Sequence, residues 1–444
     1  MIKAYLPGVL AIIFLSVICH GETIHIPADY PTVQEGIDAA VDGDTVLLAD
    51  GTFFIFNEPL NTRGKAIHLV SEHGPEHTVL RYDELNFERM LVIDSGEDEN
   101  TLIEGITFGN RSSGFKLGAS AGILIQDTSP VFIRCIVNNN FCYHDYGGGV
   151  HCINSNARFE SCEFKTCAAV NGGGFCASES SDVSLVDCLF KKNRTASSTT
   201  FCQGGGAYAR MSSSIEISGC EFRENFSDVG GGLACDETSQ TRVDTSLFVA
   251  NRAYRYGGAI YLEMTDAEHT NCIIGADNRF EDNEGLPGAD LYCTAIPENP
   301  IYARSNSFSG NFRSHVYVCP PEAFDLAGSV GEIAPIYQDV FVDDDGNNNN
   351  DGLTPDTPFR SIYYAVCRVV GTKEKPVKVR VAPGEFTNYE NEPFPLTLSS
   401  YVSLSGDCDS PPILNAEDAD VALYTHFASH QSIEHIHVKN SREV

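Results

Sequence analysis

A periodic ladder of phenylalanines constrains the fold of this chain more than any other feature. Six phenylalanines, headed by Val137, recur every 26 to 32 residues: Phe164, Phe190, Phe222, Phe248, Phe280 and Phe308. Three residues after each mark stands an asparagine or, once, a cysteine: Asn140, Cys167, Asn193, Asn225, Asn251, Asn283 and Asn311. A period of this length indicates one supersecondary unit stacked on copies of itself. The chain is therefore predicted to be a solenoid.

The residues between the marks predict an all-β unit. Short apolar segments such as 157–159, 183–186 and 215–218 have strand character, and a glycine cluster recurs once in each unit, as at 172–174. A coil of about 27 residues with several short strands and fixed corners fits a parallel β-helix, in which each strand pairs with its counterparts in adjacent coils. Kelch propellers have a period near 50 residues, and the close leucine spacing of leucine-rich repeats is missing.

Equivalent positions of stacked coils point the same way, so each column of the repeat has an expected role. The phenylalanines are predicted to stack inward. The asparagines are expected at a corner where they adopt the left-handed conformation and hydrogen-bond along the axis. Cys135, Cys162, Cys188 and Cys220 lie two residues before the marks and are predicted to be small buried thiols, so disulfides should be few.

The ends and the charge of the chain indicate its compartment. Residues 1–21 contain Lys3 and an apolar run over 9–18, as a secretory signal peptide does, and this run is too short to span a bilayer comfortably. Lipidation at Cys19 is disfavoured by the bulky Ile18 before it. The net charge of −32 disfavours nucleic acid as a partner, since phosphate contacts need a basic surface. We expect a secreted or cell-surface protein without a transmembrane helix in the mature chain.

A second internal repeat divides the chain into a first β-helix over 22–333 and the beginning of a second over 338–444. An amphipathic helix over 31–40 precedes the first, and residues 359–366 repeat this pattern, as a cap on a solenoid end does. The segment 103–110 matches 433–440, and the sequence stops four residues later. This pattern predicts that the second β-helix is incomplete here and that the natural protein is longer.

The F-x-x-N motif, together with G-G-A-I at Gly257 to Ile260, resembles the repeats of the polymorphic outer-membrane proteins of chlamydiae. It occurs at Phe190 to Asn193, Phe222 to Asn225 and Phe280 to Asn283. More broadly, residues 100–320 resemble the pectin-lyase-like superfamily. The resemblance implies a right-handed parallel β-helix on the cell surface, with adhesion as its role. Residues 337–359 resemble a cap domain of unknown function in bacterial β-helix proteins.

Binding residues are expected in the segments between the asparagine position and the next glycine cluster, because the coil itself is occupied by stacking. These segments share one edge of the solenoid, and their aromatic and basic side chains suit sugar faces and acidic groups. The predicted glycan-binding residues are Tyr143, His144, Asp145, Tyr146, Arg194, Arg252, Tyr254, Arg255 and Tyr256. The alternative interpretation is that they only shield the corner. Other surface proteins are a further candidate partner.

An enzyme of the same superfamily is the alternative function. Polygalacturonases resemble one another in Asn-Thr-Asp, Asp-Asp, Gly-His-Gly and Arg-Ile-Lys motifs, which this chain lacks on its coils. No aspartate pair is expected on corresponding strand faces, as glycoside hydrolysis would need. Asp145 and His144 with Arg252 or Arg255 imitate a lyase cluster only poorly. The sequence therefore favours non-catalytic adhesion or glycan binding over a polysaccharide lyase or glycoside hydrolase.

One loop has the composition of a cation site. Asp343, Asp345, Asn347 and Asp351 alternate hard oxygen ligands as a calcium loop does, although the bidentate glutamate of an EF-hand is missing. A polar turn before the cap helix is the alternative interpretation. Calcium is the one cofactor that the sequence suggests.

Overall fold

The computed structural model describes residues 21–56, 58–82, 89–109, 122–196, 202–263, 272–285, 288–294, 301–308, 316–319, 324–325, 336–366, 368–387, 396–398, 400–416, 422–424 and 430–440. Nearly all of the predicted signal peptide and the residue Asn311 of the asparagine column lie outside these residues.

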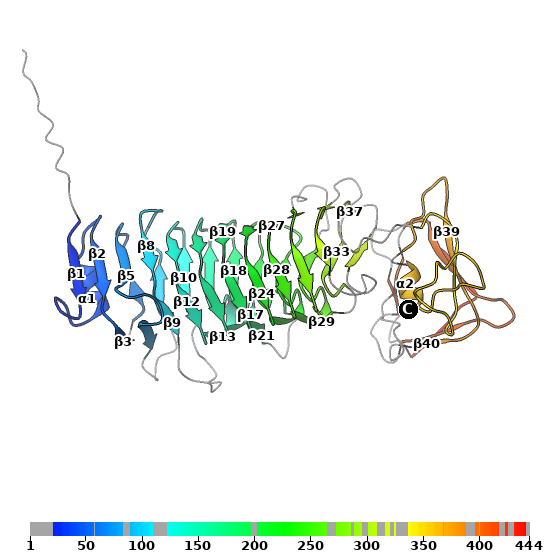
Figure 1. The fold of residues 1–444 in the computed structure, drawn as a ribbon, viewed down its shortest axis with the longest axis horizontal. Helices are drawn as coiled ribbons and strands as arrows, with labels where there is room; N and C mark the ends of the chain where they lie inside the picture. Colours follow the sequence, from blue (N-terminus) through cyan, green and yellow to red (C-terminus); the bar gives the residue numbers. More distant parts are fainter. Residues whose placement is uncertain are drawn as a thin grey trace, which may run out of the picture.

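Three long parallel sheets form the walls of a β-solenoid, with successive coils stacked along its axis (Figure 1). Sheet A has 12 strands: β1 (Thr23–Ile26), β2 (Thr45–Leu48), β5 (His68–Ser71), β8 (Leu102–Glu104), β11 (Val131–Ile133), β15 (Arg158–Glu160), β19 (Asp182–Val186), β23 (Ser214–Ser218), β27 (Gln240–Asp244), β31 (Ile273–Ile274), β34 (Ile301–Tyr302) and β37 (Phe324–Asp325).

Sheets B and C each have ten strands. Sheet B contains β3 (Gly51–Ile55), β6 (Thr78–Tyr82), β9 (Thr107–Gly109), β12 (Ile136–Asn138), β16 (Glu163–Lys165), β20 (Leu189–Lys191), β24 (Glu221–Arg223), β28 (Leu247–Val249), β32 (Arg279–Glu281) and β35 (Ser307–Phe308). Sheet C contains β4 (Leu60–Asn61), β7 (Leu91–Ile93), β10 (Ile123–Gln126), β14 (Val150–Ile153), β18 (Phe175–Ser178), β22 (Ala207–Ala209), β26 (Leu233–Cys235), β30 (Ile260–Glu263), β33 (Leu291–Thr294) and β36 (Val316–Cys319).

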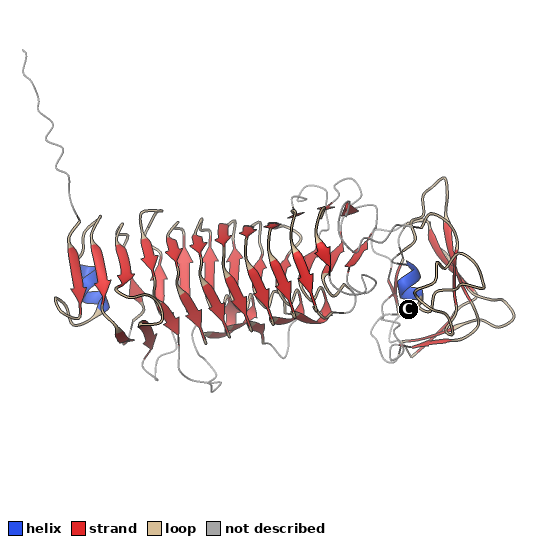
Figure 2. Ribbon diagram, in the orientation of Figure 1, coloured by secondary structure: helices blue, strands red, loops and turns tan. Residues whose placement is uncertain are grey.

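A shorter fourth sheet, sheet D, has five strands: β13 (Phe141–Tyr146), β17 (Ala168–Asn171), β21 (Arg194–Thr195), β25 (Phe226–Val229) and β29 (Arg252–Tyr256). Strands dominate the molecule, and helix is confined to two short segments among the described residues (Figure 2). The all-β parallel fold predicted from the repeat is confirmed.

The first helix, α1 (Val33–Ala39), lies at the start of the solenoid, as predicted for a cap (Figure 1). Thr32 and Glu35 form a capping box, in which the Thr32 hydroxyl accepts from the Glu35 backbone N–H at 3.2 Å. Ile37 is fully buried against the core. The helix therefore buries apolar surface at the end of the first coils.

The phenylalanine ladder is the inward stack that the sequence predicts. Neighbouring rings from Phe164 to Phe308 lie nearly parallel, with centroids 4.5 to 5.3 Å apart. Ladder residues such as Phe190 and Phe222 have no exposed surface. Each ring thus packs on the equivalent ring of the next coil, which explains why a phenylalanine recurs at this position from coil to coil.

The asparagine column hydrogen-bonds along the axis as predicted, but its expected backbone conformation was wrong. Asn225 donates through Nδ2 to Asn251 Oδ1 at 2.9 Å, and its own Oδ1 accepts from Asn193 Nδ2 at 3.1 Å. The left-handed residue is the one before the column, for example Lys192 at φ 56° and Glu224 at φ 55°. The left-handed turn directs the following amide side chain inward, where it satisfies buried backbone groups.

The four cysteines two residues before the ladder marks, Cys135, Cys162, Cys188 and Cys220, form a column whose thiols accept backbone hydrogen bonds. Cys162 Sγ accepts from the Cys135 N–H at 3.4 Å, and Cys220 Sγ accepts from the Cys188 N–H at 3.3 Å. These four buried cysteines are free thiols. Further along the column, Ser246 Oγ accepts the Cys220 N–H at 3.1 Å. The position therefore selects a small acceptor, and a thiol is one way to provide it.

The glycine clusters let neighbouring coils approach closely. Gly172 has φ +63°, which favours glycine, and a Cβ on Gly173 would lie 2.3 Å from the Arg194 carbonyl oxygen. The next coil leaves no room there for a larger residue.

Residues 336–440 contain a second set of parallel sheets with its own core, which includes Val342, Phe359 and Leu404. The strands are β38 (Val340–Val342), β39 (Val377–Val381), β42 (Val402–Ser405) and β45 (Ile433–Glu434) in sheet F, β40 (Glu385–Thr387), β43 (Ile413–Asn415) and β46 (His437–Lys439) in sheet G, and β41 (Leu396–Thr397) and β44 (Leu423–Tyr424) in sheet H. The helix α2 (Ile362–Val366) lies in the predicted second cap. The repeat of 103–110 at 433–440 is structural, since β45 and β46 correspond to β8 and β9.

Candidate functional site

The predicted binding segments are strands rather than loops. They form sheet D, which pairs in parallel from β13 to β29. The segments from 167 to 172 and from 225 to 230, each a step of five residues, give the regular strands β17 and β25. The longer segments after Asn140 and Asn251 give β13 and β29, whose pairing shifts register between Cys142 and Tyr146 and beside Val229. The extra residues are absorbed as bulges, which leave the number of coils unchanged.

Sheet D places three of its side chains in one row across adjacent coils. Arg194 pairs with Phe226, and Phe226 pairs with Arg252. Phe226 is 39% exposed, and Arg252 is exposed with its Nε 3.2 Å from Glu284 Oε2. The sequence reasoning named the two arginines but missed Phe226, although it follows Asn225 as each arginine follows its own asparagine. We call Arg194, Phe226 and Arg252 the cationic row.

The other predicted residues have different environments. Tyr254 is 75% exposed and extends the surface of the cationic row along β29. Arg255 is exposed in the bulge of that strand. Tyr143, His144 and Asp145 belong to β13, but their side chains lie outside the described part of the structure.

Tyr146 and Tyr256 pack back onto the outer face of sheet C, where they serve a second, small core. Tyr256 stacks on Tyr292 with centroids 4.8 Å apart, and Tyr292 stacks on Tyr261 at 5.4 Å. The guanidinium carbon of Arg210 lies 4.0 Å from the centre of the Tyr146 ring. These two tyrosines therefore have a packing role that their sequence position alone did not indicate.

The outer face of sheet C also carries titratable groups that the sequence reasoning missed. Arg210, Asp236 and Glu263 are partly exposed and lie at the ends of β22, β26 and β30. Burial raises the pKa of Glu263, the hydrogen bond from Tyr261 opposes this rise, and the charges of Glu237 and Asp236 add to it. The sequence predicted that no aspartate pair stands on corresponding strand faces, and it made no prediction for a pair of aspartate and glutamate. Asp236 and Glu263 directly follow the paired residues Cys235 and Leu262.

Burial also raises the pKa of the Tyr208 and Tyr261 phenols well above the usual range. Tyr208 and Tyr261 are each 6% exposed and occupy the same column on the outer face of sheet C. The signal was present in the sequence, since Tyr208 and Tyr261 stand two and three residues after their glycine clusters and directly follow the apolar residues Ala207 and Ile260. The sequence alone does not show whether an outward-facing tyrosine is covered by neighbouring side chains or exposed, because this depends on the pairing register of the strands.

The structure brings together two of the four residues of the predicted calcium loop. Asp343 and Asp345, with Asp344 between them, hold carboxylate oxygens within 4.8 Å of one another. Asn347 Oδ1 accepts from the Asn349 N–H instead. Asp351 accepts from the Leu353 N–H and from the Thr357 hydroxyl, and these bonds hold the pKa of its carboxyl below the usual range. Calcium binding here stays a prediction.

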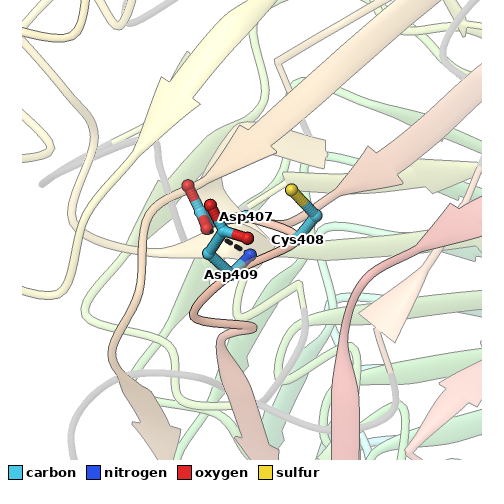
Figure 3. A group of neighbouring side chains, drawn as sticks. All are labelled: Asp407, Cys408 and Asp409. Atoms are coloured by element: carbon cyan, nitrogen blue, oxygen red, sulfur yellow. Dashed lines mark hydrogen bonds between the residues drawn. The ribbon is translucent and has the colours of Figure 1, made fainter.

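A second exposed group, Asp407, Cys408 and Asp409, lies in the turn after β42 (Figure 3). Asp407 Oδ1 accepts from the backbone N–H groups of Asp409 and Ser410 at 2.8 and 2.9 Å. These bonds explain the group as a hydrogen-bonded polar turn.

Two protein families match the sequence. Residues 121–319 match the family described as the right handed beta helix region, and residues 345–416 match a family described as a protein of unknown function. A comparison with curated proteins finds no match. The described residues contain no helix long and apolar enough to cross a membrane.

Three solved structures are similar to this chain at low identity. ORF18 of Geobacillus virus E2 is 13% identical over 70% of this chain, with a TM-score of 0.46, and this chain spans 62% of the viral protein. A pectin methylesterase in complex with a hexasaccharide is 12% identical over 71% of this chain and 91% of its own, with a TM-score of 0.33. The PL6 family alginate lyase AlyGC is 10% identical over 94% of this chain and 72% of its own, with a TM-score of 0.25.

Proposed function

We propose that this protein, whose residues 121–319 match the right handed beta helix region, is an exported surface protein that binds a glycan bearing carboxylate or sulfate groups. The observation that carries this proposal is the cationic row. Arg194, Phe226 and Arg252 stand on three successive coils of sheet D. Tyr254 enlarges the exposed aromatic surface beside them.

The spacing of the row suits a linear polymer. Neighbouring parallel strands lie about 4.8 Å apart, so the two arginines are separated by about 10 Å with an aromatic ring between them. A guanidinium binds a carboxylate or sulfate through two parallel hydrogen bonds, and an aromatic face packs against the apolar face of a sugar ring. Repeated acidic sugars therefore match a row in which cation, ring and cation alternate.

The charge of the whole molecule confines an acidic polymer to the cationic row. The chain carries a net charge of −32, so an anionic polymer is repelled from most of its surface. Two arginines on one sheet give the polymer a local point of attachment. The Nε atom of Arg252 lies 3.2 Å from Glu284 Oε2, and both side chains are exposed. A ligand anion therefore competes with the Glu284 carboxylate for the guanidinium. Binding should therefore weaken as salt is added.

Export is the second part of the proposal. The charged start and the short apolar run of residues 1–21 support it. Protein secreted from a host that recognises this leader should begin at Glu22, and N-terminal sequencing of the secreted product tests this. Recovery of the protein only inside the cell with Met1 retained would contradict export.

Binding is tested with residues 22–444 and immobilised polygalacturonate, alginate, chondroitin sulfate and a neutral glucan. We expect binding to at least one acidic polymer and a loss of at least tenfold in affinity for the Arg194→Ala and Arg252→Ala variants. Arg242→Ala is the matched control, because Arg242 is an exposed arginine on sheet A that is likewise paired with an acid, Asp244. Equal binding by all variants, or binding of the neutral polymer alone, would refute the row as the binding surface.

A further inference from the structure

Two thiols from different walls of the solenoid meet inside its core. Cys235 is the last residue of β26 in sheet C, and Cys272 directly precedes β31 in sheet A. Their Sγ atoms lie 3.8 Å apart, and the two residues are only 1% and 3% exposed. Both belong to the main hydrophobic core. We call Cys235 and Cys272 the facing thiols.

The facing thiols differ in geometry from the cysteine column described above. Stacked residues such as Cys162 and Cys188, which precede the paired strands β16 and β20, have parallel Cα–Cβ bonds separated by the strand spacing of about 4.8 Å. A disulfide needs Cβ atoms about 3.5 to 4.5 Å apart, so stacking holds the column cysteines too far from one another. The facing thiols come from two walls, and the strand spacing does not fix their separation.

The facing thiols also make weaker contacts with the backbone than the column thiols do. The Cys162 thiol accepts a backbone N–H at 3.4 Å and donates to a backbone carbonyl at 3.4 Å. By contrast, Cys235 Sγ lies 3.7 Å from the carbonyl oxygen of the next residue, and Cys272 Sγ lies 4.0 Å from Ser239 O. Loss of both thiol hydrogens therefore costs the core little at the facing thiols, whereas it removes a donor from the column.

A third buried thiol, Cys293, is too distant to compete for Cys235. Leu262 pairs with Cys235 on one side and with Cys293 on the other, so these two cysteines stand two coils apart in sheet C. Two strand spacings amount to about 10 Å, whereas a disulfide joins residues whose Cα atoms are less than about 7 Å apart. The register of sheet C thus leaves Cys272 as the partner of Cys235.

We propose that Cys235 and Cys272 form a disulfide bond while the chain folds in an oxidising compartment. The inference rests on the export part of the proposed function, because disulfides form and persist outside the cytosol. The bond joins two adjacent coils across the core and links residues 37 positions apart in the chain. Closing a loop of this length restricts the unfolded chain, and the folded solenoid is stabilised relative to it.

The oxidant is a disulfide, either a small molecule such as oxidised glutathione or the disulfide of an exported oxidoreductase. One protein thiolate attacks a sulfur of this disulfide, a mixed disulfide forms, and one thiolate of the oxidant leaves. The second protein thiolate then attacks the protein sulfur of the mixed disulfide and displaces the other thiolate of the oxidant. The two protein thiols lose two protons and two electrons, and the oxidant is reduced to two thiols.

The exchange must occur before the coils close around the facing thiols. The hydrogen bond with Cys272 and burial raise the pKa of the Cys235 thiol in the folded chain. Because the thiolate is the reactive form, folded and reduced protein should form the bond at least tenfold more slowly than refolding protein does. The same burial shields the finished bond from reductants.

The test refolds residues 22–444 from urea in a glutathione redox buffer, blocks the remaining thiols with iodoacetamide and identifies unreduced tryptic peptides by mass spectrometry. Cleavage after lysine and arginine places Cys235 in the peptide 224–242 and Cys272 in the peptide 256–279, and each peptide contains one cysteine. We expect these two peptides to be joined and the cysteines of the column to be alkylated.

Thermal unfolding gives a second readout. Wild-type protein refolded with oxidised glutathione should unfold about 5 °C or more above protein refolded and heated with a reductant. Cys272→Ser should lose this difference. Cys162→Ser is the matched control and should keep it, since Cys162 is a buried cysteine outside the pair. Comparing two redox states of one variant removes the effect of the substitution itself on stability.

Each other outcome contradicts a defined step. Refolded protein in which Cys235 and Cys272 are both alkylated overturns the bond. A link from Cys235 to Cys293, or one within the cysteine column, overturns the assignment of the partner. Equal unfolding midpoints in the two redox states of the wild type overturn the stabilising role. Recovery of the protein only inside the cell contradicts export alone, because the link in refolded protein still supports the bond.

Discussion

Replacing Asn225 by alanine should test the hydrogen-bonded column that holds adjacent coils together. The Asn225 side chain has no exposed surface. Its Nδ2 donates to Phe190 O at 2.9 Å, and its Oδ1 accepts from the Asn193 backbone N–H at 2.9 Å. Alanine leaves this N–H without its acceptor and removes a donor from the Phe190 carbonyl. At about 1 to 3 kcal/mol for each buried polar group, we expect a loss of about 3 to 5 kcal/mol.

Replacing Asn225 by cysteine should lower the free energy of unfolding by about 1 to 2 kcal/mol, because a thiol replaces the two amide hydrogen bonds by weaker ones. The protein contains this replacement at Cys167, whose Sγ donates to Val137 O at 3.5 Å. Exposed Asn100 provides the control, and Asn100→Ala should change stability by less than about 0.5 kcal/mol. Urea unfolding followed by circular dichroism measures all three variants. Equal stability of Asn225→Ala and the wild type, or an equal loss for alanine and cysteine, would refute the reasoning.

Three further predictions concern other groups. The free energy of unfolding of Cys188→Ser should lie within about 1 kcal/mol of the wild-type value in the same assay, because Ser246 already provides a serine acceptor at the equivalent position of another coil. Burial raises the pKa of Glu263 in the folded protein. The free energy of unfolding should therefore fall as the pH rises from the usual glutamate pKa of about 4.3 through the folded-state pKa. Urea midpoints measured across this pH range should show the decline in the wild type and not in Glu263→Gln. The hydrogen bond to Asp50, aided by its charge, raises the pKa of His73, and Asp50→Asn should lower it toward about 6.5 in an NMR titration; an unchanged titration would contradict this pairing.

The order of residues is enough to predict the solenoid and its internal columns. The phenylalanine of each coil is followed three residues later by the asparagine position, as Phe222 is by Asn225. Only stacked coils give every copy of this pair the same neighbours. The cap at α1 and its repeat at α2 followed from two similar amphipathic segments. These features depend on local pattern and on repetition, both of which are visible in the order of residues alone.

Contacts between side chains of different coils depend on the register of the folded sheets. Segment length indicated that 252–256 differs from its neighbours, but the bulge directs Tyr256 onto sheet C and leaves Tyr254 exposed. Asp236 and Glu263 are 27 residues apart in the chain (263 − 236), and their shared column depends on the register of β26 with β30. A shift of one residue in that register would move one of them to the opposite face, because side chains alternate along a strand. Pairing across coils, which single-strand patterns do not encode, therefore decided which of these side chains are neighbours.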